Sequence, residues 1–506
     1  MLKRVLVANR GEIAVRLIRG LRETGTTAIA IFSDADRDSL HVRLADEAYR
    51  IGPPPSEESY LKLDAIVSLA KKVKADAVHP GYGFLAENED FPARCKANGL
   101  VFIGPSSRAI KAMGNKLVSR KTAVSASVPI IPGATSPARG IGEARASARG
   151  IGYPIMLKAA AGGGGKGLRI VKEEKELESA IRLTQGEARA AFGNDEVYVE
   201  KYISRPRHIE IQILADERGN CVYLGERECS IQRRHQKVIE ETPSVIVTPE
   251  LRKQMGEAAV RIAKAVGYTN AGTVEFIVDE KRNFYFLEMN TRLQVEHPVT
   301  ELVTGIDLVK EQLRVASSKK LSFKQEDVRP RGHAIECRIY AEDPYNSFLP
   351  SAGKILRLRL PEGPGIRNDA GIFQGCDVSV YYDPLLAKLV VWGSDRKEAI
   401  ERTRRALSEY LIDGVATTIP FHRWIMEQPE FGKGDIHADF IDAKFSASPP
   451  VEKAGLLRAA IIAAALDVFE KERKIVLPKT EEGKTKPSAW KLFGRLRSPH
   501  EVHRLD

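Results

Sequence analysis

The sequence predicts a fold of mixed class, with an α/β region at the N-terminus and α+β regions after it. Three observations carry this prediction: strand-like and helix-like stretches alternate over the first hundred residues, a short mixed stretch follows a break near residue 133, and long alternating strands dominate the remainder. The chain has 506 residues, which exceeds the usual size of a single hydrophobic core, so we expect several domains.

The first hundred residues predict a doubly wound domain, meaning a parallel sheet with helices on both faces. The expected elements are a strand at 5–8, a helix at 13–22, and strands at 28–32, 77–78 and 100–103. The first loop reads Asn9-Arg10-Gly11-Glu12-Ile13 and lacks the glycine fingerprint of dinucleotide-binding domains. The sequence therefore argues against a dehydrogenase.

Proline and glycine residues between 129 and 133 interrupt this pattern and indicate a domain boundary near residue 133. We expect an N-terminal domain at 1–132, a small α+β insert at 133–203, a β-rich region at 204–447, and a helical, basic tail at 448–506. The finer expected elements are insert strands at 154–159, 168–171 and 197–203 with a helix between the last two, an amphipathic helix at 396–411, and a tail helix at 456–470.

The composition excludes several classes of protein. The longest apolar run, 459–466, is far shorter than the roughly 20 residues of a membrane helix, and the N-terminus shows no signal cleavage site. The five cysteines form no CxxC pair, so we expect neither disulfides nor a zinc site, and a cytoplasmic location fits best. The net charge of +11 is scattered among acidic residues, which favours small anionic substrates over nucleic acid.

Four adjacent glycines within 162–167 lie between two expected strands and predict a phosphate-binding loop. The stretch is not a Walker A motif, since residue 160 is Ala and residue 167 is Gly. Ordering four glycines costs much conformational entropy, and their backbone NH groups can approach phosphates closely. Lys158 and Lys116 would add positive charge there. A flexible surface loop is the alternative.

The stretch 273–288 predicts a hairpin that carries two facing carboxylates. If the turn is centred between Lys281 and Arg282, antiparallel pairing places Glu275 directly opposite Glu288. Two carboxylates at such a distance repel unless one is protonated or a cation lies between them. Mg²⁺ is the cation we expect, because it accepts few carboxylates and completes its shell with phosphate oxygens.

Polar residues continue this surface beyond the hairpin. If the strand extends through residue 296, its periodicity places Glu288, Asn290, Arg292, Gln294 and Glu296 on one face, next to the metal and extending into a substrate site. A solvent-facing polar edge would show the same alternation. Two further groups have the same polar character, namely His208, Glu210 and Gln212, and Gln232, His235 and Lys237, although either histidine could be a hydrogen-bonded core residue.

These stretches together resemble the biotin carboxylase family of ATP-grasp enzymes. The resemblance covers residues 1 to about 447, and its motifs are highly specific in combination. The matching stretches are 7–14, 79–88, 158–167, 288–297 and 333–339. The resemblance implies an ATP-grasp fold in which the insert is a mobile lid and the C-terminal region is β-rich.

The resemblance also implies roles for individual residues. The implied ATP contacts are Lys116, Lys158, Gly164, Gly165, Glu200, Lys201, Ile203, His208, Gln232 and His235. The implied metal ligands, for Mg²⁺ or Mn²⁺, are Glu275, Glu288 and Asn290. The implied bicarbonate site is Lys237, Arg292, Gln294 and Val295, with Glu296 as the base and Arg338 as the group that stabilises the biotin enolate.

The implied activity is ATP- and bicarbonate-dependent carboxylation of biotin through carboxyphosphate. No biotinylation motif occurs in the sequence, so the resemblance implies that biotin arrives on a separate carrier protein, with separate carboxyltransferase subunits and a homodimeric enzyme. The assembly would be an acetyl-CoA or propionyl-CoA carboxylase or a two-subunit pyruvate carboxylase. Two rivals are another ATP-grasp ligase that ignores biotin and a nucleotide-binding regulatory protein without catalysis.

Overall fold

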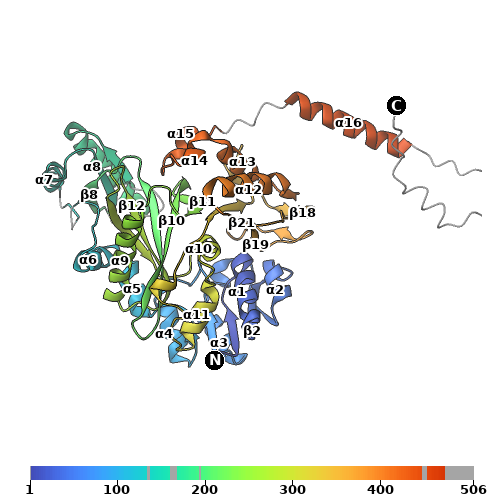
Figure 1. Cartoon of the computed structure of the whole chain (residues 1–506), viewed down its shortest axis with the longest axis horizontal. Coiled ribbons are helices and arrows are strands. Elements are labelled where there is room, and N and C mark those ends of the chain that lie inside the picture. The colour runs from blue at the N-terminus through green and yellow to red at the C-terminus, as the bar shows by residue number, and fades with distance from the viewer. Residues whose placement is uncertain are drawn as a thin grey trace, which may run out of the picture. The chain divides into compact units, whose positions relative to one another are not determined.

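The computed structural model describes residues 2–133, 137–138, 140–159, 168–192, 195–446 and 453–472 (Figure 1). The chain divides into two compact units, Met1–Ala447 and Ser448–Asp506. No helix among these residues combines the length and apolar character that crossing a lipid bilayer requires. The first unit holds every element discussed below except α16, which spans Lys453–Glu472 where the sequence predicted 456–470.

The N-terminal domain is doubly wound, as predicted. Its parallel sheet has the order β3-β2-β1-β4-β5, formed by Arg4–Val7 (β1), Thr27–Ser33 (β2), Glu47–Gly52 (β3), Ala77–His79 (β4) and Val101–Phe102 (β5). Alternate residues of β1 enter different cores: Val5 packs in one cluster with Leu17 of α1 (Gly11–Glu23), and Leu6 in another with Ile66 of α3 (Leu63–Lys72). Strand β3 was not predicted, because it lies at the sheet edge and is only partly buried.

An antiparallel sheet of eight strands forms the centre of the first unit. Its order is β13-β12-β9-β10-β11-β14-β21-β19. The strands are Arg207–Ala215 (β9), Cys221–Arg233 (β10), Gln236–Thr242 (β11), Asn270–Val278 (β12), Phe284–Asn290 (β13), His333–Tyr340 (β14), Ile366–Ala370 (β19) and Leu385–Gly393 (β21). The main helices that accompany it are Pro249–Ala265 (α9), His297–Thr304 (α10), Leu308–Ala316 (α11), Arg396–Glu409 (α12), Ile419–Glu427 (α13), Pro429–Lys433 (α14) and Phe440–Lys444 (α15).

Helix α12 covers one end of this sheet through the face that the sequence predicted. Ile400, Thr403 and Leu407 are buried there. The helix ends at Glu409, earlier than expected, because Leu411 already belongs to β22 (Leu411–Asp413), which pairs with β18 (Arg357–Arg359). The predicted buried face of the helix was therefore correct at Ile400, Thr403 and Leu407 and wrong at Leu411.

The insert has its own three-stranded sheet, in the order β7-β6-β8, from Leu168–Val171 (β7), Ile155–Ala159 (β6) and Val197–Lys201 (β8). Helices α7 (Ile141–Ile151) and α8 (Leu177–Phe192) pack on it around a separate small core. Figure 1 shows α7 and α8 at one side of the large sheet and α12 and α13 at the other. The Lys201 amide donates to Pro132 O over 2.7 Å, so the two ends of the insert meet beside the rest of the unit.

Candidate active site

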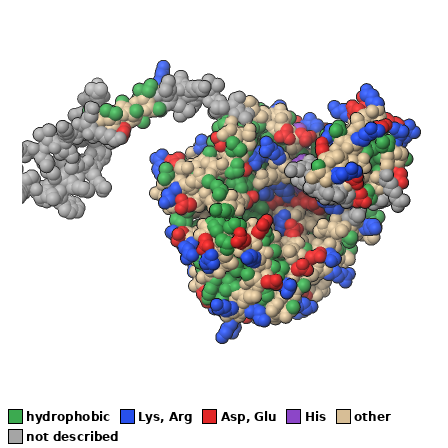
Figure 2. Space-filling model, turned by 180° about the vertical axis from the view of Figure 1, so that it is seen from behind, with side chains coloured by type: hydrophobic (Ala, Val, Ile, Leu, Met, Phe, Trp, Pro, Cys, Tyr) green, Lys and Arg blue, Asp and Glu red, His purple; other side chains and the backbone are tan. Residues whose placement is uncertain are grey.

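Two clefts meet within the first unit. The larger, of about 790 Å³, lies between the insert and strands of the eight-stranded sheet, with Lys158 on one side and Glu288 on the other. The smaller, of about 470 Å³, lies between the N-terminal domain and the stretch that contains Tyr381 and Tyr382. Both clefts are lined by Gln236, Arg292, Val295 and Arg338. In the space-filling view a hollow holds basic and acidic side chains together (Figure 2).

The predicted carboxylate pair is present on the β12–β13 hairpin, where Glu275 faces Glu288. The turn differs from the prediction, because the pairing of Val278 with Phe284 centres it on Lys281. A β-bulge between Glu275 and Phe276 in the ladder skips Leu287 and restores the expected pair. The prediction was correct at the functional position and wrong by half a residue at the turn.

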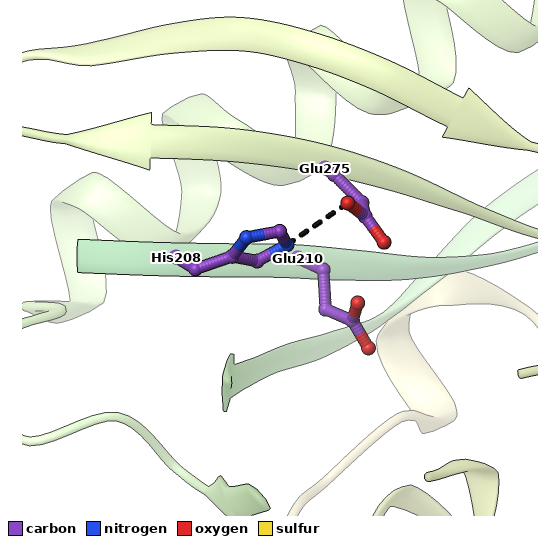
Figure 3. A group of neighbouring side chains, drawn as sticks. All are labelled: His208, Glu210 and Glu275. Atoms are coloured by element: carbon purple, nitrogen blue, oxygen red, sulfur yellow. Dashed lines mark ion pairs between the residues drawn. The ribbon is translucent and has the colours of Figure 1, made fainter. Parts of the chain in front are cut away.

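Two side chains of the protein already contact the Glu275 carboxylate. Lys237 Nζ lies 2.8 Å from Glu275 Oε1, and His208 Nε2 lies 2.9 Å from Oε2 (Figure 3). Burial raises the pKa of Glu275, but the charges of Lys237 and His208 outweigh burial and hold this pKa below its usual value. The protein itself therefore supplies part of the positive charge that we expected beside Glu275 and Glu288.

Glu288 has a different environment. Among the described residues no hydrogen bond or ion pair engages its carboxylate, which is exposed at the larger cleft. Surrounding protein and the charge of Glu275 raise the pKa of Glu288. Asn290 lies next to both, with Nδ2 2.8 Å from Glu275 Oε1. An open carboxylate beside a second carboxylate and an amide fits a hard divalent cation that also binds phosphate oxygens.

Lys237 connects three buried carboxylates. Its Nζ lies 2.6 Å from Glu210 Oε2 and 2.8 Å from Glu296 Oε1, in addition to Glu275. Burial lowers the pKa of Lys237, but the three glutamates outweigh burial and raise it well above its usual value. Glu210 also lies close to His208 and Glu275 (Figure 3), and the Lys237 ammonium provides a positive charge for this acidic group.

Glu296 is fully buried just before α10; it does not line either cleft itself, but it contacts Lys237 and Arg338, which do. Its Oε2 accepts a hydrogen bond from Arg338 over 3.0 Å, while Lys237 binds its other oxygen. Burial raises the pKa of Glu296, but Lys237, Arg338 and Arg227 outweigh burial and hold it well below its usual value. Glu296 is therefore an ionised carboxylate held between two cations.

The stretch 291–296 is a loop, which corrects the predicted strand. Strand β13 ends at Asn290, and the following residues reach the site by loop geometry rather than by alternation. Arg292 nevertheless binds Asn290 Oδ1 over 3.0 Å and Gln294 Oε1 over 2.8 Å. Lys388 of β21 donates to Val295 O over 2.8 Å, and this hydrogen bond holds the loop against the sheet.

Most of the residues predicted to contact ATP line the larger cleft, but some of them do not. Lys158, Lys201, Ile203, His208, Gln232 and His235 line the larger cleft, as do Glu275 and Glu288. Glu200 is buried and bound by Lys158 and Arg120. Lys116 begins α6 (Lys116–Ser125) and is not among the residues that line the cleft. Gly164 and Gly165 lie outside the described residues.

Sequence reasoning missed several residues that support this site. Glu87 binds Arg292 Nε over 2.8 Å, and Glu240 binds Arg338 Nε over 2.6 Å. Lys388 is fully buried in a strand that is otherwise apolar. That isolated lysine was a detectable signal, because an unpaired lysine is rarely buried. Glu240 gave no comparable signal.

The fold and this cleft define a class, the ATP-grasp ligases. Three family models match in succession: "Biotin carboxylase, N-terminal domain" over residues 1–110, "Carbamoyl-phosphate synthase L chain, ATP binding domain" over 115–324, and "Biotin carboxylase C-terminal domain" over 336–443. The chain belongs to the biotin carboxylase family, and it is an ATP-dependent ligase of that type.

Curated relatives agree over most of the chain. Biotin carboxylase 1 of Bacillus subtilis is 54% identical over 87% of this chain and 98% of its own length. Biotin carboxylase of Haemophilus influenzae is 51% identical over 88% of this chain and 99% of its own length. A pyruvate carboxylase component of Methanothermobacter thermautotrophicus is 54% identical over 87% of this chain and 90% of its own length.

Solved structures show the same fold. The biotin carboxylase of Campylobacter jejuni in complex with β-γ-ATP has a TM-score of 0.83 at 46% identity, covering 88% of this chain and 99% of that one. The biotin carboxylase domain dimer of Hydrogenobacter thermophilus 2-oxoglutarate carboxylase, in complex with MgADP, ADP and bicarbonate, has a TM-score of 0.82 at 48% identity, covering 88% and 99%.

Proposed function

We propose that this chain carboxylates biotin held on a separate carrier protein, with ATP and bicarbonate as the other substrates. The observation that carries the proposal is Glu296, an ionised buried carboxylate held between Lys237, which lines the larger cleft, and Arg338, which lines both clefts. A base held between these two residues is placed to act on a substrate bound beside either of them. A module that only binds nucleotide has no use for it, which disfavours the regulatory alternative.

The larger cleft takes ATP, and its lysines and amides supply the contacts. Lys158, Lys201 and His208 face this space from the insert and from β9. Lysine ammonium groups compensate phosphate charge. Glu288, Glu275 and Asn290 would hold Mg²⁺, or alternatively Mn²⁺, and the ion would supply charge neutralisation for the transferred phosphoryl group.

Bicarbonate binds at the junction, where Arg292, Lys237 and Gln294 meet. A guanidinium fork matches a planar oxyanion, and Glu296 accepts the bicarbonate proton. The deprotonated oxygen attacks the γ-phosphorus, the bond from that phosphorus to the bridging oxygen breaks, and ADP and carboxyphosphate result. Bicarbonate is a poor nucleophile, and it becomes an effective one because Glu296 removes its proton as the oxygen attacks.

Biotin occupies the smaller cleft, beside Tyr82 and Arg338. Carboxyphosphate decomposes to CO₂ and phosphate, and the phosphate removes the N1′ proton of the ureido ring. Arg338 stabilises the negative oxygen of the resulting enolate, and N1′ then bonds to the carbon of CO₂. Arg338 is suited to this role because its guanidinium stays charged at every relevant pH.

In this proposal the insert at 133–203 closes over ATP as a lid. Support comes from its separate core and from the side chains of Met156, Lys158 and Ile170 that it contributes to the cleft. Phosphate charge favours closure, because Lys158, which is paired with Glu200 in this structure, gains a second anionic partner when the lid closes over ATP. Hydrogen exchange in β6 and β7 should slow when an ATP analogue binds, and equal exchange with and without the analogue would remove the lid from the mechanism.

The enzyme works with other polypeptides in this proposal. The relatives named biotin carboxylase match this chain over nearly their whole length, which supports a carrier and carboxyltransferase on other polypeptides. The dimer named for the Hydrogenobacter structure supports a homodimer. The final acceptor is an acyl-CoA or pyruvate, and assays with the neighbouring subunits of the purified complex decide between them. A cytoplasmic location stays a prediction.

Glu296→Gln tests the proposed chemistry. ATP hydrolysis by the wild type should rise when bicarbonate and free biotin are both present, and Glu296→Gln should abolish that rise while ATP binding is retained. The exposed Glu326→Gln is the matched control and should behave as the wild type. Stimulation by an amine or amino acid instead of biotin would assign the chain to another class of ATP-grasp ligase.

A further inference from the structure

A second pair of facing glutamates lies in the same sheet, away from the ATP cleft. Glu240 of β11 is the direct ladder partner of Glu336 of β14. Both side chains are fully buried. Directly facing residues of an antiparallel ladder have Cβ atoms about 4.5–5.5 Å apart, so the two carboxyl groups share one small space.

This space is closed by apolar side chains. Glu336 lies on the face of β14 that also carries Ala334, and helix α10 packs on that face through Val299 and Val303, together with Val390 of β21. Within the described part of the chain, neither oxygen of Glu336 accepts a hydrogen bond, and Glu240 Oε2 accepts none. Three buried carboxyl oxygens without donors indicate a proton between the two groups, since an unpaired buried carboxylate costs several kcal/mol.

Few positive charges face the pair. From β14, Arg338 donates from Nε to Glu240 Oε1 over 2.6 Å, but the same guanidinium also binds Glu296. From β21, Lys388 is bound to Val295 O and lies 3.2 Å from Glu12. Lys237 of β11 binds the three carboxylates of the ATP cleft. These cations are largely engaged elsewhere, so they do not balance two further negative charges.

The titration behaviour agrees with this geometry. Burial raises the pKa of Glu240 to about 7, against the opposing effect of Arg338. Burial also raises the pKa of Glu336 well above its usual value, against Lys388 and Arg338. The charge of Glu240 adds to burial in raising the pKa of Glu336, so Glu336 is the group that favours the protonated form.

We propose that Glu336 and Glu240 share one proton, and that Glu336 positions Arg338 by donating a hydrogen bond to Glu240. The carboxylic acid of Glu336 donates to Glu240 Oε2. Glu240 then keeps one negative charge, and its Oε1 remains free to accept from Arg338. The resulting chain of contacts runs from Glu336 through Glu240 and Arg338 to Glu296. Glu336 is a positioning residue, because it acts on the substrate only through two others.

This arrangement fixes the orientation of the Arg338 guanidinium. Because Glu336 is protonated, the Glu240–Glu336 pair places only one negative charge beside it. Glu240 holds Nε of the guanidinium, and Glu296 holds one of its terminal nitrogens. If both Glu240 and Glu336 were ionised, their combined charge would draw the guanidinium away from the smaller cleft. The inference rests on the proposed function only for the role of Arg338 toward biotin. The shared proton stands independently of it.

Infrared spectroscopy of the intact protein tests the shared proton without any assay of activity. Glu336→Gln should lose one carbonyl stretching band of a protonated carboxylic acid near neutral pH, relative to the wild type. Glu241→Gln, at the residue that follows Glu240 on β11 and on the opposite face of that strand, should lose a carboxylate band instead. An unchanged protonated-acid band in Glu336→Gln would show that Glu336 is ionised and would overturn the shared proton.

Kinetics with two substitutions at one position test the positioning role. Gln can donate to Glu240 as the acid does, so Glu336→Gln should retain biotin-dependent turnover within about threefold. Met has similar size but no donor, so Glu336→Met should lower kcat for biotin carboxylation by about tenfold or more, the effect of one lost hydrogen bond to a charged group, with the KM for ATP unchanged.

Different results would contradict the positioning role of Glu336, the shared proton and the proposed function. Equal turnover in the wild type, Glu336→Gln and Glu336→Met would overturn the positioning role, as would an equal loss in both variants. A wild-type protein that ignores biotin, but loses the acid band in Glu336→Gln, would refute the proposed function and leave the shared proton standing. Thermal melting of each variant checks folding, which a neutral residue at this site should not impair.

Discussion

Two pairs of facing glutamates in one sheet have opposite surroundings. Glu275 and Glu288 lie on β12 and β13 beside the larger cleft, where Lys237 and His208 bind Glu275 and Glu288 stays open. The pair on β11 and β14, Glu240 and Glu336, is closed beneath α10. Both pairs consist of directly facing residues of an antiparallel ladder. They differ in whether solvent can reach the carboxyl groups and in which cations contact them.

A facing carboxylate pair does not by itself indicate a metal. Where solvent and phosphate oxygens can enter, the repulsion of the pair is relieved by a divalent ion, with its shell completed from the cleft. Where apolar side chains close the space, a proton is the economical solution. Substitutions that change access or charge at each pair separate these two cases.

Lys237→Met should have the largest effect. It leaves Glu210, Glu275 and Glu296 without their shared cation, so we expect a loss of stability of about 3–5 kcal/mol, as for a broken buried ion pair. Biotin-dependent turnover should fall at least about a hundredfold. Urea unfolding and the ATPase assay measure both. The exposed Lys253→Met should match the wild type, and a fully stable Lys237→Met would show that the acidic group is neutralised by other means.

Glu288→Gln should affect the metal and not the fold. One open ligand is lost, so the Mg²⁺ concentration for half-maximal ATPase should rise by about tenfold to a hundredfold. Because the change also removes repulsion against Glu275, the metal-free protein should melt no lower than the wild type. A marked drop in its melting temperature would instead make Glu288 a structural partner.

Glu336→Gln should change the pH dependence of stability. The raised pKa of Glu336 in the folded state means that its favourable contribution is complete below the unfolded value of about 4.3 and is lost as pH rises toward the folded value. The wild type should therefore lose up to about 1.4 kcal/mol per pH unit relative to Glu336→Gln within that window. Parallel stability curves would contradict the raised pKa.

Glu241→Gln, at the residue that follows Glu240 on β11, should change the pH dependence of stability with the opposite sign. Burial raises the pKa of Glu241, but His333 and Arg396 outweigh burial and lower it to about 2. Its contribution is present above the unfolded value of about 4.3 and is lost as pH falls through about 2. The stability advantage of the wild type over Glu241→Gln should therefore shrink on acidification, and an advantage that grew would reverse this assignment.

The sequence predicted the first pair and missed the second for a physical reason. Glu275 and Glu288 belong to one hairpin, so local alternation fixes their register once the turn is placed, and a bulge corrected the small error in that turn. Glu240 and Glu336 are brought together by the order of strands in the sheet, which local pattern does not encode. The mixed fold class was correct because apolar periodicity is a local property as well.

The loop at 291–296 shows the same limit within the active site. Alternation predicted a strand, yet Arg292 and Gln294 reach the site from a loop held by Lys388. The chemistry of these residues could be predicted from their types and from the resemblance of their motif. Their geometry could not, because it depends on a buried lysine about ninety residues later in the chain.

Oxygen transfer from bicarbonate to phosphate tests the central claim most directly. If Glu296 activates bicarbonate for attack on the γ-phosphorus, then bicarbonate labelled with heavy oxygen must pass a labelled oxygen to the phosphate released during biotin carboxylation. Mass spectrometry of that phosphate should show the label with the wild type and with Glu326→Gln, and no labelled phosphate with Glu296→Gln. Phosphate that carries only solvent oxygen, released by the wild type at an undiminished rate, would contradict the account.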